Sequence, residues 1–165
     1  MKNLLLFATC TAFFFYSCTS NKATITPQTG ISATINGTNE KFNDKDSIRT
    51  IGTTGIYFSG GDGTTVTSNR IAFYISNPSN VTPGTYTSPT SPIQIFYEKG
   101  GPFTNDYFYN EGSAFPVTIT VTAVSSTNIQ GTFSGKLILE SMVNDETPET
   151  VTITDGKFNV IANTQ

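Results

Sequence analysis

The sequence predicts an all-β fold, either an antiparallel β-sandwich or a small flattened barrel of about nine to ten strands. Short segments rich in Ile, Val, Thr, Phe and Tyr alternate apolar and polar residues with a period of two. Clusters of Gly, Pro, Asn and Asp separate these segments at spacings of about 8 to 15 residues. No stretch after residue 30 has the sustained 3.6-residue periodicity of an amphipathic helix.

The first expected hairpin begins the domain. Apolar and polar residues alternate over 31–35, and Asn36-Gly37 follows directly. This dipeptide favours a two-residue turn because both of its residues tolerate a positive φ. A partner strand is therefore expected over 40–43.

The middle of the chain predicts a series of further strands. Three are expected over 47–51, 55–59 and 69–76, and a short one follows the Pro83-Gly84 turn. A second hairpin is expected over 93–98 and 103–110. The Gly-rich segment 60–63 is expected to be a loop.

Three longer strands complete the predicted domain, over 117–123, 129–139 and 151–161. The first of them alternates Val, Ile and Ala with Thr, which is typical of a half-buried antiparallel strand with one solvent face. Asp155-Gly156 is expected to form a turn or bulge inside the last strand.

The N-terminus has the pattern of a signal peptide over residues 1–17. Lys2 supplies a short positive region, and residues 4–16 are apolar apart from two threonines. About 13 apolar residues form a helix too short for the roughly 20 needed to cross a bilayer. The small residue Ser17 precedes the expected cleavage point.

Cys18 follows that point and is the expected site of lipidation. Cys10, the only other cysteine, has too few apolar residues before it and is removed with the signal peptide. Lipid on Cys18 would consume the remaining thiol and anchor the chain to a membrane. Residues 18–29 are then the lipidated cysteine and a polar tether, and 30–165 form one domain. An ordinary secretory signal with an incidental cysteine is the alternative.

Several segments carry a family resemblance. The Phe15-Tyr16-Ser17-Cys18 stretch resembles a relaxed lipobox. The Pro83-Gly84-Thr85-Tyr86 turn, the strand at 118–121 leading into GTFSG (131–135), and VTITDGKFN (151–159) follow in order. Together they resemble Bacteroidota-type outer-membrane lipoproteins that carry a β-rich domain of unknown function. One departure is that such chains often place Trp where this chain has residues 38–42.

The resemblance implies acylation, for example with palmitate, at Cys18 and attachment to the outer membrane. It implies no catalytic residues. In surface-exposed members an acidic run follows the cysteine, whereas residues 19–22 contain no acidic residue. The periplasmic side is therefore favoured over the cell surface.

Composition argues against several function classes. The net charge is −3 and the few Lys and Arg are scattered, which disfavours nucleic-acid binding. The chain has no His and no Trp, so the commonest general base and metal ligand are missing. The loops at 43–47 and 60–63 hold oxygen ligands, but neither completes a Ca²⁺-binding pattern. We expect no enzyme activity, no cofactor and no metal site.

Aromatic residues concentrate between residues 86 and 109, and exposed aromatic rings can stack on the pyranose rings of sugars. The candidate ligand contacts are Tyr97, Phe103, Tyr107 and Tyr109. Alternation would bury about half of such a set in the core. Asp46-Ser47-Ile48 is also similar to a bacterial O-glycosylation acceptor, so Ser47 is a candidate modification site, with a turn-to-strand junction as the alternative.

Three functions are compatible with these observations. The first is a non-enzymatic binding or accessory lipoprotein whose aromatic segment contacts glycan or an envelope protein. The second is a purely structural envelope lipoprotein. The third is a β-barrel that carries an apolar ligand. Exposure of the aromatic rings would favour the first, and their burial would favour the second.

Overall fold

The structure is a computed structural model that describes residues 29–42, 49–50, 55–61, 68–76, 81–100 and 106–161. These residues form antiparallel strands and one short 3₁₀ helix, η1 (Glu140–Met142). The all-β prediction is confirmed. The signal peptide, Cys18, most of the tether, Ser47 and Phe103 lie outside the described residues.

Eleven strands lie within the described ranges, close to the expected nine or ten. They are β1 (Gly30–Ile35), β2 (Thr38–Phe42), β3 (Arg49–Thr50), β4 (Gly55–Gly61), β5 (Arg70–Ser76), β6 (Gly84–Thr87), β7 (Ile93–Glu98), β8 (Tyr107–Tyr109), β9 (Val117–Val124), β10 (Asn128–Leu139) and β11 (Thr150–Ile161). The bounds of β7 are those predicted from the sequence. Strand β8 is shorter than the strand expected over 103–110.

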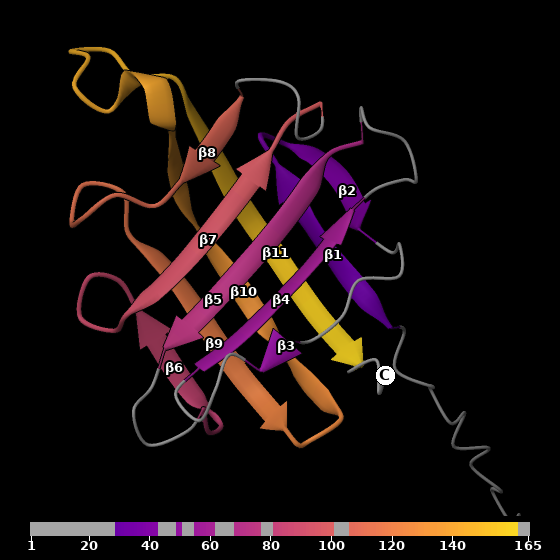
Figure 1. Ribbon diagram of the computed structural model, residues 1–165. Coiled ribbons are helices and arrows are strands. Elements are labelled where there is room, and N and C mark those ends of the chain that lie inside the picture. Colours follow the sequence, from indigo (N-terminus) through magenta and orange to yellow (C-terminus); the bar gives the residue numbers. More distant parts are fainter. Residues whose placement is uncertain are drawn as a thin grey trace, which may run out of the picture.

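All strand pairs are antiparallel, and the neighbour order is β2-β1-β11-β10-β8-β7-β5-β4-β3. Strand β11 pairs with one edge of β10. The other edge of β10 pairs first with β9 and then, further along, with β8. Strand β6 pairs with the free edge of β9. The sheet therefore curls into a half-barrel in which β4, β5 and β7 cross in front of β9, β10 and β11 (Figure 1).

A cluster of phenylalanine rings fills the space between the two layers. The ring of Phe58 on β4 stacks on that of Phe73 on β5, with centroids 4.6 Å apart. From the opposite layer, Phe158 on β11 lies 4.8 Å from Phe58, and Phe133 on β10 lies 4.5 Å from Phe73. All four are at most 3% exposed. Aromatic contacts across the curl therefore hold its two layers together.

The first hairpin has the turn that its sequence predicts. Asn36 and Gly37 have φ values of 48° and 85°. The Asn36 side-chain oxygen also accepts a hydrogen bond from the Thr152 amide at 2.8 Å, and the Asn36 amide donates to the Thr152 carbonyl at 2.9 Å. The turn is thereby fixed to β11 as well as closing β1 and β2.

The predicted irregularity at Asp155 is a β-bulge in β11. Asp155 has a φ of 52°, and the register with β10 shifts between Phe133 and Gly135. A Cβ at Gly156 would lie 2.4 Å from the Phe133 carbonyl oxygen, so only glycine fits there. The bulge bends β11 and contributes to the curl of the sheet.

Candidate functional site

The structure separates the predicted aromatic residues into two groups. Tyr97 is 2% exposed and lies in the core, on the same face of β7 as Ile93 and Ile95. Tyr107 and Tyr109 are half-buried and lie on the opposite, outer face of the sheet. Of the candidate contacts that the structure describes, Tyr97 therefore presents no ring to solvent, and the other two do.

Tyr97 has a structural role instead. Its hydroxyl donates to the two Glu40 carboxylate oxygens, at 3.0 and 3.2 Å. The Asn69 side-chain amide donates to the same carboxylate at 3.2 Å, and the Asn69 side-chain oxygen accepts from the Gly100 amide at 2.8 Å. This network links β2 to β7 across the curl.

The outer face of β4, β5, β7 and β8 carries the other aromatic side chains. We call this surface the aromatic face, and it consists of Tyr57, Tyr74, Phe96, Tyr107 and Tyr109. Every one of these residues is half-buried. Along a strand every second side chain points to the same face of the sheet. The five rings occupy the outward-facing positions of their strands, so they all lie on one side.

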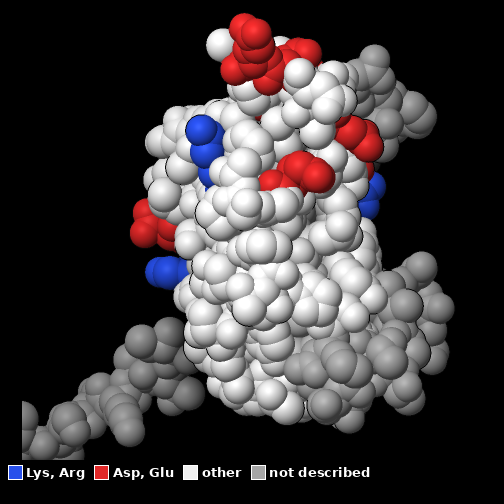
Figure 2. Space-filling view, turned by 90° about the vertical axis from the view of Figure 1, so that its left-hand side faces the viewer, with Lys and Arg blue, Asp and Glu red and all other residues white. Residues whose placement is uncertain are grey.

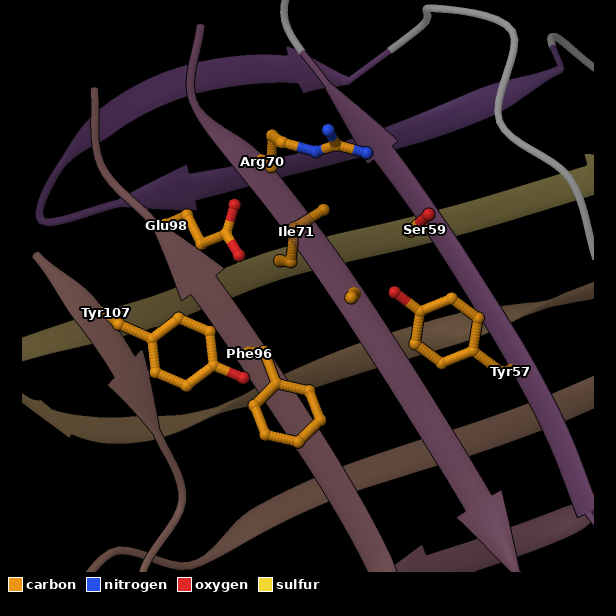
Figure 3. A pocket seen from close by; sticks show the side chains of 8 residues that line it. Tyr57, Ser59, Arg70, Ile71, Phe96, Glu98 and Tyr107 are labelled. Carbon is orange, nitrogen blue, oxygen red and sulfur yellow. The ribbon is translucent and has the colours of Figure 1, made fainter. Parts of the chain in front are cut away.

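A hollow of about 220 Å³ lies in the aromatic face. Ala72 on β5 forms part of its floor, and the rings of Tyr57, Phe96 and Tyr107 surround it (Figure 3). Ser59, Arg70 and Glu98 also line it. The hollow exists because two small side chains, Ala72 on β5 and its direct neighbour Ser59 on β4, lie among the rings of the aromatic face.

The rings around this hollow lie flat rather than on edge. Phe96 and Tyr107 have centroids 5.6 Å apart and planes inclined by only 26°. In Figure 3 the rings of Phe96, Tyr107 and Tyr57 are all seen nearly face-on, and the Tyr57 and Tyr107 hydroxyls point inward over the strands between them. The rings therefore offer their faces to a ligand above the sheet.

Polar groups stand beside the rings. Arg70 and Glu98 are direct cross-strand neighbours at one end of the hollow. Burial, together with the nearby carboxylates of Glu98 and Glu140 and the Tyr57 phenol, raises the pKa of the Tyr107 hydroxyl to about 12. Tyr107 therefore remains protonated at neutral pH and can donate a hydrogen bond to a ligand oxygen.

A second surface hollow, of about 520 Å³, has a different character. It lies over β1, β10 and β11, and its outward side chains are polar, including Lys41, Lys157 and Thr132. Its one aromatic residue, Phe158, is only 3% exposed. This hollow offers no stacking surface, which makes the aromatic face the stronger candidate.

Charged side chains are unevenly distributed over the surface. Figure 2 shows the side that lies to the left in Figure 1. Among the described residues, acidic side chains are most numerous there toward the end where η1 lies, and the part of the described surface farthest from that end shows no charged group. That side therefore has few charged groups that could attract a charged ligand over a long range.

Sequence reasoning missed Phe96, Tyr57 and Tyr74. The polar neighbours Gln94 and Glu98 at positions two before and two after Phe96 indicate that its side chain faces outward. Ile93 and Ile95 indicate in the same way that Tyr97 faces inward. The alternation could therefore have selected Phe96 in place of Tyr97.

Comparison of the chain with protein-family models, with curated proteins and with solved structures finds no match. Within the described ranges no helix is long and apolar enough to span a membrane. In the same part of the chain, no three His, Cys, Asp or Glu side chains are grouped so as to hold a metal ion.

Proposed function

We propose that this protein binds carbohydrate, without catalysis, through the aromatic face of β4, β5, β7 and β8. The observation that carries the proposal is the set of three ring faces, Tyr57, Phe96 and Tyr107, around the hollow floored by Ala72. The C–H face of a pyranose ring is apolar and packs on such rings, while its equatorial hydroxyls need hydrogen-bonding groups around it.

The polar groups of the hollow suit those hydroxyls. The Tyr107 and Tyr57 hydroxyls and the Glu98 carboxylate stand at its rim. A purely apolar ligand would make no hydrogen bond to these groups, and any that it buried would lose its bonds to water. A sugar satisfies the rings and the rim together, whereas the packed phenylalanine interior gives no support to an apolar ligand inside the curl.

Lipid on Cys18 would place this module at a membrane. Cys18 lies outside the described residues, and its lipidation rests on the apolar run before it and on its position after Ser17. The first described residue, Thr29, is joined to Cys18 by only ten residues, which span at most about 35 Å when fully extended. The proposed protein is a lipid-anchored envelope lipoprotein whose β-domain contacts glycan close to that membrane.

A glycan array tests the proposal with the full chain purified in detergent. We expect binding to at least one polysaccharide, and a loss of about tenfold or more in affinity for Phe96→Ala and Tyr107→Ala. Phe115→Ala is the matched control, because Phe115 is a half-buried ring outside this hollow that packs under Lys136. The Phe115→Ala variant should bind the same polysaccharide with native affinity.

Tyr107→Phe separates stacking from hydrogen bonding, since it retains the ring and removes the hydroxyl. It should restore most of the affinity that Tyr107→Ala loses. Absence of binding to every glycan, or equal binding by native protein and Phe96→Ala, would contradict the proposal. Capture of a protein partner by the same face would instead support an accessory role in the envelope.

A further inference from the structure

A third hollow lies on the same outer surface as the first. It has a volume of about 450 Å³ and is lined by Tyr74, Gln94, Tyr109 and the turn that contains Pro89 and Ser91. Tyr74 and Gln94 are the outward residues of β5 and β7 that come next along the strands after Ala72 and Phe96. One strand repeat of two residues spans roughly 6.6 Å, so the two hollows adjoin.

Two aromatic pairs mark the border between the hollows. Tyr57, in the first hollow, is the direct cross-strand partner of Tyr74, in the other. Phe96, in the first, is likewise the partner of Tyr109, in the other. Side chains directly opposite each other on adjacent strands lie about 5 Å apart at Cβ, so the two hollows meet at these pairs.

A path between the two aromatic pairs connects the floor of the first hollow to that of the third. Ala72 on β5 and Gln94 on β7 are diagonal neighbours, because Ala72 is opposite Phe96 and Gln94 is opposite Tyr74. The Tyr57–Tyr74 pair lies on one side of this diagonal and the Phe96–Tyr109 pair on the other. Ala72 is small, and the exposed Gln94 side chain projects from the surface, where it can contact a ligand on this path.

The third hollow also supplies polar groups for a sugar. The Gln94 side chain both donates and accepts, and Ser76 and Ser91 contribute hydroxyls. Burial and a hydrogen bond to Glu111 raise the pKa of the Tyr109 phenol, and because its proton is donated to Glu111, its oxygen can accept a hydrogen bond from a sugar hydroxyl. The first hollow alone matches a single ring, whereas the pair of hollows matches a chain of rings.

We infer that the ligand is an extended, linear β-1,4-linked polysaccharide that crosses both hollows, passing over Ala72 and Gln94 between the two aromatic pairs. This inference rests on the proposed carbohydrate binding and specifies its ligand. A β-1,4-linked chain is flat and presents alternate ring faces along its length, which fits near-parallel rings such as Phe96 and Tyr107. A short or branched sugar would occupy the first hollow only.

Chain-length dependence tests the inference by calorimetry on the full chain in detergent. The probes are the disaccharides and hexasaccharides of β-1,4-linked glucose, xylose, mannose and N-acetylglucosamine. For the best-bound sugar we expect the hexasaccharide to bind about tenfold or more tightly than the disaccharide, because it adds contacts in the third hollow.

Variants of the third hollow should remove that gain alone. Tyr74→Ala should weaken hexasaccharide binding about tenfold and leave disaccharide binding within about twofold of native. Gln94→Ala should act in the same direction, and because Gln94 is exposed, this change leaves the core intact. Thr132→Ala, on the exposed face of β10, is the control and should change neither affinity.

The outcomes distinguish the two proposals. Equal affinity for disaccharide and hexasaccharide, or equal weakening of both by Tyr74→Ala and Gln94→Ala, would overturn the extended ligand while the carbohydrate site stands. Hexasaccharide binding that survives Phe96→Ala would overturn the aromatic face itself. Binding of none of the probes at either length would overturn the β-1,4-linked ligand, and it would overturn both proposals if the glycan array also shows no binding.

Discussion

The Tyr97 hydroxyl lies 3.0 Å from one Glu40 carboxylate oxygen, and this contact joins β7 to β2 across the curl of the sheet. Phe96, the preceding residue, faces the opposite way and lines the candidate site. Two adjacent aromatic residues therefore have different surroundings: Tyr97 packs in the core and bonds to Glu40, and Phe96 lies on the aromatic face.

Tyr97→Phe should lower the free energy of unfolding by about 1 to 2 kcal/mol, because Glu40 loses a donor in a part-buried setting. Urea denaturation followed by far-UV circular dichroism measures this. Carbohydrate affinity should be unaffected, since Tyr97 lies in the core. A variant with native stability and reduced affinity would show that the roles of residues 96 and 97 are reversed.

Asn110 completes the hydrogen bonding of β7 where β8 ends. Its side chain accepts from the Ile95 amide at 2.7 Å and donates to the Ile93 carbonyl at 3.2 Å, and the residue is 8% exposed. Asn110→Ala should destabilise the protein by about 2 to 3 kcal/mol, because both backbone groups lose their partner. The fall in the urea midpoint should clearly exceed that of Thr132→Ala, and equal midpoints would contradict the assignment.

Gly131 permits the close approach of β9 and β10. A Cβ there would lie 2.0 Å from the Thr120 carbonyl oxygen and 2.5 Å from the Phe158 ring. Gly131→Ala should therefore cost about 3 kcal/mol or more, since backbone must move to relieve the clash. Gly37→Ala is the comparison, because that site has no atom within 4 Å and only its positive φ opposes a side chain. A thermal scan should show the larger loss for Gly131→Ala.

Stability should fall at high pH in a way that depends on Tyr107. Its pKa is raised from 10.0 to about 12 in the folded protein, so the unfolded chain loses this proton first. The contribution of the protonated Tyr107 phenol to the free energy of unfolding is complete below pH 10 and is lost as the pH rises toward 12. Urea midpoints measured across this range should fall less steeply for Tyr107→Phe than for the native protein. Identical pH dependence of the two would contradict the raised pKa.

Cys18→Ala should abolish lipid attachment and release the protein from the membrane fraction. Metabolic labelling with an alkyne analogue of palmitate should mark the native chain and leave the variant unlabelled. Cys10→Ala is the control, because residue 10 lies within the expected signal peptide, and it should still be labelled. A labelled Cys18→Ala protein would contradict the assignment of the anchor.

The sequence predicted the strands well because period-two alternation is strong in this chain. Strand β7 and the Asn36-Gly37 turn were located from local residues alone. The order of strands was not predictable in the same way. The pairing of β5 with β7 and of β6 with β9 depends on contacts between segments far apart in the chain, which local periodicity does not encode.

The candidate site was predicted only in part for the same reason. Tyr107 and Tyr109 were selected from the local density of aromatic residues, and both lie on the aromatic face. Tyr57 was not selected, because it is separated from that aromatic cluster in the sequence and joins it only through the pairing of β4 with β5. The hollow over Ala72 depends on the cross-strand register, which places a small side chain among large ones.

The most direct test of the central claim is an NMR titration of the full chain with the best-bound β-1,4-linked hexasaccharide, observing the aromatic ring resonances. We predict saturable shifts for Tyr57, Phe96 and Tyr107, with Tyr97 and Phe133 unchanged because both lie in the core. Shifts confined to other rings, or no shift of the Phe96 ring at saturating ligand, would contradict carbohydrate binding by the aromatic face.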